Sequence, residues 1–159
     1  MNALIVYDSV FGNTEKVART IGEALGANGQ VDTLPVSQAT MDKLRGLDML
    51  IVGSPTRSFR PTPAVSQFLK TLPKNHLAGV QVAVFDTRIW LDTIDSSVFR
   101  FVVNKGGYAA STMANVLKMK GGQLFVPPEG FLVTGEQGPL KEGELERAAS
   151  WARQIQLAK

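Results

Sequence analysis

A short loop near the start of the chain carries the residues best suited to bind an anion. The apolar run 3–6 precedes it, and an amphipathic segment with Val17, Ile21 and Leu25 on one face follows it. Such a strand–loop–helix unit aims backbone N–H groups and a helix N-terminus at one point, where a phosphate group is the natural ligand. The loop residues that we expect around this point are Ser9, Val10, Phe11, Gly12, Asn13 and Thr14.

The same loop residues also fit a purely structural role. Gly12 lets a ligand approach the backbone without a Cβ in the way, and Ser9, Asn13 and Thr14 can donate side-chain hydrogen bonds to phosphate oxygens. Asn13 or Thr14 could instead only cap the helix. The loop lacks the Gly-Lys-Ser/Thr of nucleotide triphosphate loops and the repeated glycines of the dinucleotide fingerprint. On this segment alone, both interpretations stay open.

Strand and helix patterns alternate along the rest of the chain. Continuous apolar runs are typical of strands that are buried on both faces of a parallel sheet. The alternation predicts an α/β doubly wound fold, with a five-stranded parallel sheet in the order 2-1-3-4-5 and helices on both faces. The expected strands are 3–6, 30–34, 49–52, 80–85 and 124–126, the last continued by 131–133. The expected helices follow the first loop and then cover 41–45, 63–72, 108–120 and 141–157.

The segment 91–107 is too long for a plain connection between the fourth strand and the next helix. It includes Phe99, Phe101 and Val102, and is too apolar for a solvated loop. We interpret it as an extra short helix beside the mouth of the sheet, which could cover a ligand. A packed insertion or a subunit contact fits the pattern equally well.

The composition of the chain narrows the possible functions. Its 159 residues, 44% of them hydrophobic, suit a single domain over 1–159 with a substantial core. The absence of cysteine excludes disulfides and thiolate chemistry. A net charge of +3 without a Lys/Arg block gives no indication of nucleic-acid binding. No signal peptide or membrane-spanning run appears, so we expect a cytoplasmic protein.

No residue stands out as a catalyst or metal ligand. The single histidine, His76, lies in a polar loop after a helix. Asp92 and Asp95 could act as acid and base, but on a polar loop such residues are more often solvated or capping. We find no spacing of ligand residues that indicates a metal site.

Three loops are expected to meet where the strand order reverses, beyond the carboxyl ends of the strands. Besides the first loop, these are the Pro- and Arg-rich loop 54–63 and the segment 86–90. They bring Phe59 and Trp90, which could stack on the two faces of a flat ring, although either could equally be packed into the core. Together the loops predict a site for a phosphorylated planar ligand.

These loops resemble those of the flavodoxin-like FMN-binding proteins, and the resemblance covers nearly the whole chain. The segment 9–14 resembles the family's Ser/Thr-x-Thr-Gly-x-Thr phosphate loop, with Phe11 in place of the middle threonine. Segments 53–57 and 86–88 resemble the second and third flavin loops, and 138–145 resembles small single-domain members. The resemblance implies FMN as the cofactor and adds to the site Ser54, Pro55, Thr56, Arg57, Ser58, Phe59, Asp86, Thr87, Arg88 and Trp90.

The resemblance implies a protein of electron transfer, whose partner is a redox protein or a small-molecule acceptor. An FMN-dependent NAD(P)H reductase of quinones or other small acceptors is the alternative. Electron-carrying flavodoxins are usually acidic, whereas this chain has a charge of +3. If Arg57, Arg60 or Arg88 lies close to the ring, its charge stabilises the reduced flavin anion and favours two-electron reduction. Arginines that point to solvent would contribute little.

Overall fold

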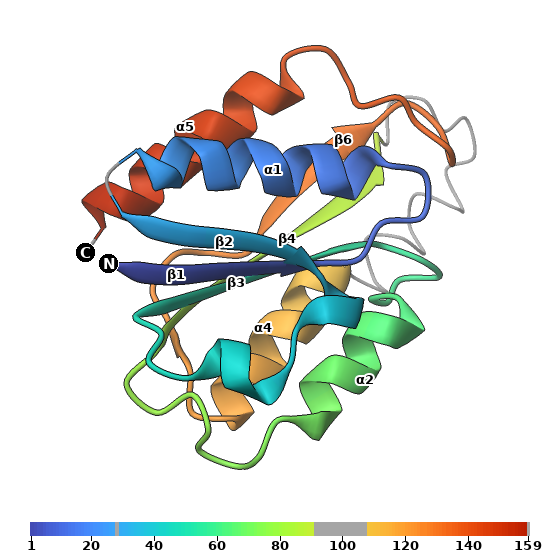
Figure 1. The fold of residues 1–159 in the computed structure, drawn as a ribbon. Helices are drawn as coiled ribbons and strands as arrows, with labels where there is room; N and C mark the ends of the chain where they lie inside the picture. Colours follow the sequence, from blue (N-terminus) through green and yellow to red (C-terminus); the bar gives the residue numbers. More distant parts are fainter. Residues whose placement is uncertain (28, 91–107, 159) are drawn as a thin grey trace.

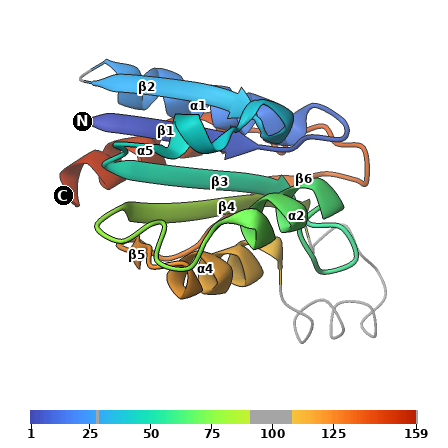
Figure 2. The same cartoon turned by 60° about the horizontal axis from the view of Figure 1, so that its bottom comes forward.

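The computed structural model describes residues 1–27, 29–90 and 108–158. Its centre is a twisted parallel β-sheet with helices on both faces (Figures 1 and 2). The strand order is β2-β1-β3-β4-β5, with β6 also paired to β4. The predicted order 2-1-3-4-5 is therefore confirmed. The predicted insertion 91–107 lies outside the described residues.

The central strands are the continuous apolar runs of the sequence. Side chains alternate between the two faces of a strand, and in β1 both faces are covered. Leu4 and Val6 pack in the cluster that includes α2 and α4, whereas Ile5 packs in the one that includes α1 and α5. The strands are β1 Asn2–Tyr7, β2 Gln30–Pro35, β3 Met49–Pro55, β4 Gln81–Ile89, β5 Gln123–Leu124 and β6 Glu129–Val133.

Among the described residues, two α-helices cover each face of the sheet, α1 and α5 on one side and α2 and α4 on the other (Figure 1). Val17, Ile21 and Leu25 of α1 are completely buried, as their spacing predicted. In the described part of the chain, no helix is long and apolar enough to cross a membrane. The helices are α1 Asn13–Gly26, α2 Pro63–Thr71, α4 Ala109–Met119 and α5 Glu144–Leu157.

The fifth position of the sheet is divided between two strands. β5 pairs with the start of β4, and β6 pairs with Phe85–Ile89 farther along the same strand. Pro127 and Pro128 lie between them, and proline has no N–H for a β-ladder. The predicted fifth strand and its continuation are thus observed as two strands, which brings the sheet to six strands among the described residues.

Two predicted helices differ from the observed ones. The segment predicted as a helix at 41–45 forms a 3₁₀ helix, Met41–Leu44, and only Leu44 of it is buried. One buried side chain gives no apolar stripe to hold an α-helix against the sheet. α5 begins at Glu144, later than the predicted start at 141, because Gly143 before it has a left-handed φ of 89°.

β3 and β4 extend farther than their apolar runs, and this extension shapes the site. Ser54 pairs with Asp86 and Pro55 with Thr87 in the ladder between these strands. The predicted strand ends at 52 and 85 are therefore wrong. Paired backbone groups allow polar residues to continue a strand when their side chains also find partners. Ser54 meets this condition, since its hydroxyl accepts the N–H of Thr62 at 3.0 Å.

Three aromatic rings pack between the sheet and α5. Phe85, Phe131 and Trp151 pack edge to face with ring centroids 6.0–6.1 Å apart. A Cβ at Gly53 would lie 2.1 Å from the ring of Phe85, so only glycine leaves room for this arrangement. This cluster fixes β3, β4 and β6 beside one another and places Trp151 in the core.

Candidate functional site

A cavity of about 290 Å³ opens at the carboxyl ends of the strands. Its wall comes from the loop after β1, the ends of β3 and β4, and the end of β6 with the segment that follows it. Parallel strands bring these ends to one edge, so the three predicted loops do meet. The lining residues are Val10, Phe11, Asn13, Thr14, Pro55, Thr56, Arg57, Ser58, Thr87, Arg88, Ile89, Val133 and Glu136.

The predicted site residues fall into two groups. Most of them line the cavity, whereas the following do not: Ser9, Gly12, Ser54, Phe59, Asp86 and Trp90. The sequence interpretation missed Ile89, Val133 and Glu136, which line the cavity as well. The apolar run 131–133 was a usable signal, because a strand beside β4 must end at the same edge of the sheet.

Ser9 stabilises the first loop through hydrogen bonds within the segment. Its hydroxyl accepts the N–H of Gly12 at 3.1 Å and that of Glu15 at 3.2 Å. Gly12, with a left-handed φ of 93°, turns the chain into α1. Within the described chain, the N–H groups of Asn13 and Thr14 at the start of α1 have no hydrogen-bond acceptor. The helix therefore presents free donors and the positive end of its dipole to the cavity.

Asn13 and Thr14 are engaged in contacts that the sequence did not show. The Nδ2 of Asn13 donates to the carbonyl of Gln137 at 3.1 Å, which ties the first loop to the segment after β6. The hydroxyl of Thr14 lies 2.8 Å from that of Thr87 on β4, and both side chains are buried. Each hydroxyl retains hydrogen-bonding capacity beyond this one contact.

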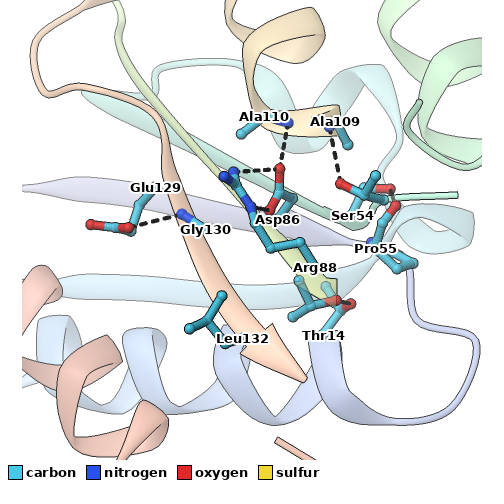
Figure 3. A network of polar contacts seen from close by, with 12 residues as sticks. Thr14, Ser54, Pro55, Asp86, Arg88, Ala109, Ala110, Glu129, Gly130 and Leu132 are labelled. Carbon is cyan, nitrogen blue, oxygen red and sulfur yellow. Dashed lines mark hydrogen bonds and ion pairs between the residues drawn. The ribbon is translucent and has the colours of Figure 1, made fainter. Parts of the chain in front are cut away.

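Asp86, which is buried, and Arg88, which is partly exposed, form an ion pair beside the cavity (Figure 3). The Nε and Nη2 of Arg88 donate to the two oxygens of Asp86 at 2.6 and 2.8 Å. The N–H of Ala110 at the start of α4 donates to the same carboxylate at 2.9 Å. Burial raises the pKa of Asp86, against the opposing effects of Arg88 and Ala110. Asp86 does not line the cavity itself, but it positions Arg88, which does.

The guanidinium of Arg88 packs against both Tyr108 and Gly130. Its Cζ lies 3.7 Å from the centroid of the Tyr108 ring. On β6, a Cβ at Gly130 would lie 2.1 Å from the Nε of Arg88. Arg88 is thereby fixed at the cavity wall, with its charge balanced locally by the carboxylate of Asp86.

Among the described residues, the aromatic ring that lines the cavity belongs to Phe11. Phe11 is 42% exposed, and the Cζ of Arg57 lies 5.5 Å from the centroid of its ring. Phe59 lies in a turn with a positive φ of 68°. The ring of Trp90 lies 4.5 Å from the Nζ of Lys141, and the backbone N–H of Trp90 donates to the carbonyl of Val133 at 2.8 Å. Stacking by Phe59 and Trp90 stays a prediction.

Two relatives share part of this sequence. An uncharacterized protein of Methanocaldococcus jannaschii is 33% identical over 88 residues, which are 49% of this chain and 22% of that protein. A flavodoxin of Synechocystis is 38% identical over 52 residues, 33% of this chain and 31% of that protein. The aligned regions thus span less than a third of either relative.

Solved structures resemble the whole chain in fold. Flavodoxin 2 from Bacillus cereus superposes with a TM-score of 0.76 at 21% identity, over 100% of both chains. Oxidised flavodoxin 1 from the same organism has a TM-score of 0.76 at 16% identity, over 99% of this chain and 98% of that one. Rubredoxin:oxygen oxidoreductase from Desulfovibrio gigas has a TM-score of 0.73 at 20% identity, over 99% of this chain and 35% of that one.

The family itself is identified by a sequence model. The model described as "Flavodoxin domain" matches residues 4–124, a span that contains the first loop and the ends of β3 and β4. The resemblance of the chain to the flavodoxin-like FMN-binding family is therefore confirmed. The chain belongs to the flavodoxin domain family.

Proposed function

We propose that this protein binds one FMN in the cavity at the strand ends and takes part in electron transfer. The observation that carries the proposal is the free N-terminus of α1, which opens into a cavity at the switch point of a flavodoxin-family fold. Bound there, the flavin would accept and donate electrons. The described chain would bind it, orient it and limit the access of water.

The first loop fits a phosphate monoester. The free N–H groups of Asn13 and Thr14, the hydroxyl of Thr14 and the dipole of α1 would hold it. A phosphate carries about −1.5 to −2 charge near neutral pH, yet the segment 9–14 contains no lysine or arginine. Charge-assisted bonds from neutral donors would therefore supply most of the binding energy.

The rest of the cavity fits a flat ring. Pro55, Ile89 and Val133 give it apolar walls, while the hydroxyls of Thr56 and Thr87 provide a few polar groups. This mixture is typical of sites that hold a planar cofactor. Arg88, neutralised by Asp86, would place a donor near the ring with little net charge.

The decisive test is the identity of the flavin. We expect the purified protein to be yellow and to release FMN on heating, at one flavin per chain, as measured by absorbance and chromatography. The apoprotein should bind FMN more tightly than FAD, because the loop offers one terminal phosphate site and lacks the glycines of a pyrophosphate site. Release of FAD, or no binding of added FMN, would contradict the proposal.

Stacking by Trp90 is part of this proposal, supported by its position next to Ile89, which lines the cavity. Bound FMN should quench tryptophan fluorescence, and Trp90→Phe should remove most of that quenching. Trp151 in the core provides the internal comparison, since it stays in the variant. Quenching that is unchanged in Trp90→Phe would assign the signal to Trp151 and remove Trp90 from the site.

A reductase of quinones or other small acceptors is the second candidate. It is favoured by Arg57, which lines the cavity and has no carboxylate partner among the described residues. A positive charge near the ring would stabilise the reduced flavin anion. Mixing the FMN-loaded protein with NADPH or NADH separates the candidates, because rapid bleaching of the flavin absorbance is expected only of the reductase.

A further inference from the structure

A tight turn beside the cavity holds two exposed arginines that have no carboxylate partner among the described residues. We propose that this turn, Arg57–Arg60, together with Val10 and Phe11, is a docking surface for an acidic redox protein. The identity of the partner as a redox protein rests on the proposed function. The surface and the charge that it selects rest on the geometry of the turn.

The two arginines lie directly opposite each other. The N–H of Arg57 donates to the carbonyl of Arg60 at 2.8 Å, and the N–H of Arg60 donates back at 3.0 Å. This exchange defines a two-residue hairpin, in which opposite side chains project from the same face. The turn thus presents two guanidinium groups side by side.

The backbone of the hairpin is costly for its sequence. Ser58 and Phe59 have φ angles of 51° and 68°, in the left-handed region where Gly and Asn are favoured. Like charges directly opposite across a hairpin also destabilise it. Neither the strained backbone nor the pair of like charges stabilises the fold. Strained backbone of this kind concentrates at functional positions.

Neither arginine has a carboxylate partner in the described part of the chain, and both are exposed. The Cζ of Arg57 lies 5.5 Å from the ring of Phe11, which joins the hairpin to the first loop. The only carboxylate that lines the cavity in the described chain is Glu136, on the segment after β6. The hairpin side of the opening is therefore positive.

Exposed apolar side chains lie beside these charges. Val10 is 50% exposed and Phe11 42% exposed, and both also line the cavity. Aromatic residues and arginines around an apolar centre are typical of protein–protein interfaces. Ser58 at the tip of the hairpin is exposed as well, so a protein surface can reach the whole turn. These features favour a protein partner that offers carboxylates, the groups that guanidinium binds bidentately.

The probes are two proteins of the same size and opposite charge: native cytochrome c, which is basic, and cytochrome c with succinylated lysines, which is acidic. Binding to this protein is measured by calorimetry at low and at moderate ionic strength, with no flavin required. Reduction of each probe by the photoreduced, FMN-loaded protein is the second readout. Failure of FMN binding would thus remove the second readout alone.

Arg60→Glu is the test variant, because Arg60 does not line the cavity. Lys74→Glu is the matched control, since Lys74 is exposed in the loop between α2 and β4, at the opposite end of the sheet, and the charge change is the same. Arg60→Gln removes charge without reversing it. Arg60→Glu should also replace a like pair by an opposite pair, so its melting temperature should not fall.

We expect the acidic probe to bind at least about tenfold more tightly than the basic one at low salt, and less tightly as salt rises. Arg60→Glu should weaken that binding by roughly threefold to tenfold, and Arg60→Gln by less. Lys74→Glu should change it less than about twofold.

Three results would overturn the proposal. If basic cytochrome c bound more tightly than the succinylated form, the docking surface would prefer a positively charged partner. If Arg60→Glu and Lys74→Glu lost equal affinity for the acidic probe, the net charge of the protein alone would explain the binding. Competition by micromolar 2′,5′-ADP would make the hairpin a site for a small anionic ligand.

Discussion

The hydroxyls of Thr14 and Thr87 face each other across the cavity wall at 2.8 Å. Thr14→Val keeps the shape of the side chain but removes its hydrogen bonds. If Thr14 holds the phosphate, this variant should weaken FMN binding by about tenfold or more, because a charge-assisted bond contributes roughly 1.5–3 kcal/mol. Riboflavin, which has no phosphate, should bind almost as before. Fluorescence titration of both ligands measures the two affinities.

Thr87→Val is the matched control for that prediction. It removes the same hydrogen bond from the other side and leaves the hydroxyl of Thr14 in place. We expect it to change the affinities for FMN and riboflavin by similar factors. Equal losses of FMN and riboflavin in Thr14→Val would instead show that Thr14 serves only the structure of the loop.

Gly130 is predicted to be intolerant of any side chain. A Cβ there would lie 2.1 Å from the Nε of Arg88, which cannot withdraw easily because Asp86 and Tyr108 hold its guanidinium. Gly130→Ala should therefore lower the free energy of unfolding by about 1–3 kcal/mol, as overpacking does. Urea denaturation measures the change.

Gly135→Ala is the corresponding control. A Cβ at Gly135 has only the carbonyl of Gly138 near it, at the ordinary contact distance of 3.6 Å. This variant should differ little from wild type. A Gly130→Ala protein as stable as the control would mean that Arg88 moves without cost.

At the level of elements, the outer edge of β6 is closed by the residues around the start of α5. The N–H of Leu132 donates to Glu144 at 2.7 Å, and the carbonyl of Leu132 accepts the N–H of Lys141 at 2.8 Å. Arg147 donates to the carbonyl of Gly130 and to Glu144. An edge strand with satisfied backbone groups resists pairing with another chain.

This arrangement predicts a pH dependence of stability. Burial acts to raise the pKa of Glu144, but Arg147, the N–H of Leu132 and Lys141 outweigh it and lower the pKa below its ordinary 4.5. A carboxyl whose pKa is lowered by folding stabilises the folded state when ionised. That stability is present above pH 4.5 and is lost as the pH falls through the lowered value.

Glu144→Gln should therefore be less stable than wild type at neutral pH, and the difference should shrink as the solution is acidified below pH 4.5. Denaturant unfolding at a series of pH values provides the measurement. Glu146→Gln is the control, because Glu146 is exposed in the same first turn of α5. Parallel pH curves for wild type and Glu144→Gln would contradict the assigned ion pair.

For the whole molecule, the site links ligand binding to global stability, because its walls come from the loop after β1, the start of α1, and the ends of β3, β4 and β6. A ligand that binds only the folded state at about 100 times its Kd adds about 2.7 kcal/mol. For a chain of this size, we expect FMN to raise the melting temperature by roughly 5–10 °C.

Riboflavin at the same concentration should raise the melting temperature less, since the free donors of α1 would lack a phosphate. Differential scanning calorimetry checks both values. Equal shifts with the two ligands would place the binding energy in the ring alone and leave the first loop without its proposed role.

The sequence by itself determined the architecture and the family. Continuous apolar runs such as 49–52 mark strands buried on both faces, and the stripe of Val17, Ile21 and Leu25 marks the first helix. These are local patterns, because burial and periodicity are encoded in neighbouring residues. For the same reason the sequence alone indicates the loop segments 9–14 and 54–58.

Only the tertiary structure decided what each side chain does at the site. Asp86 binds Arg88 and the start of α4, and Asn13 holds Gln137, a residue far along the chain. Such pairings depend on strand register and on elements that come together from distant parts of the sequence. The opposed arginines 57 and 60 follow from a turn whose two central residues adopt positive φ, which their types do not predict.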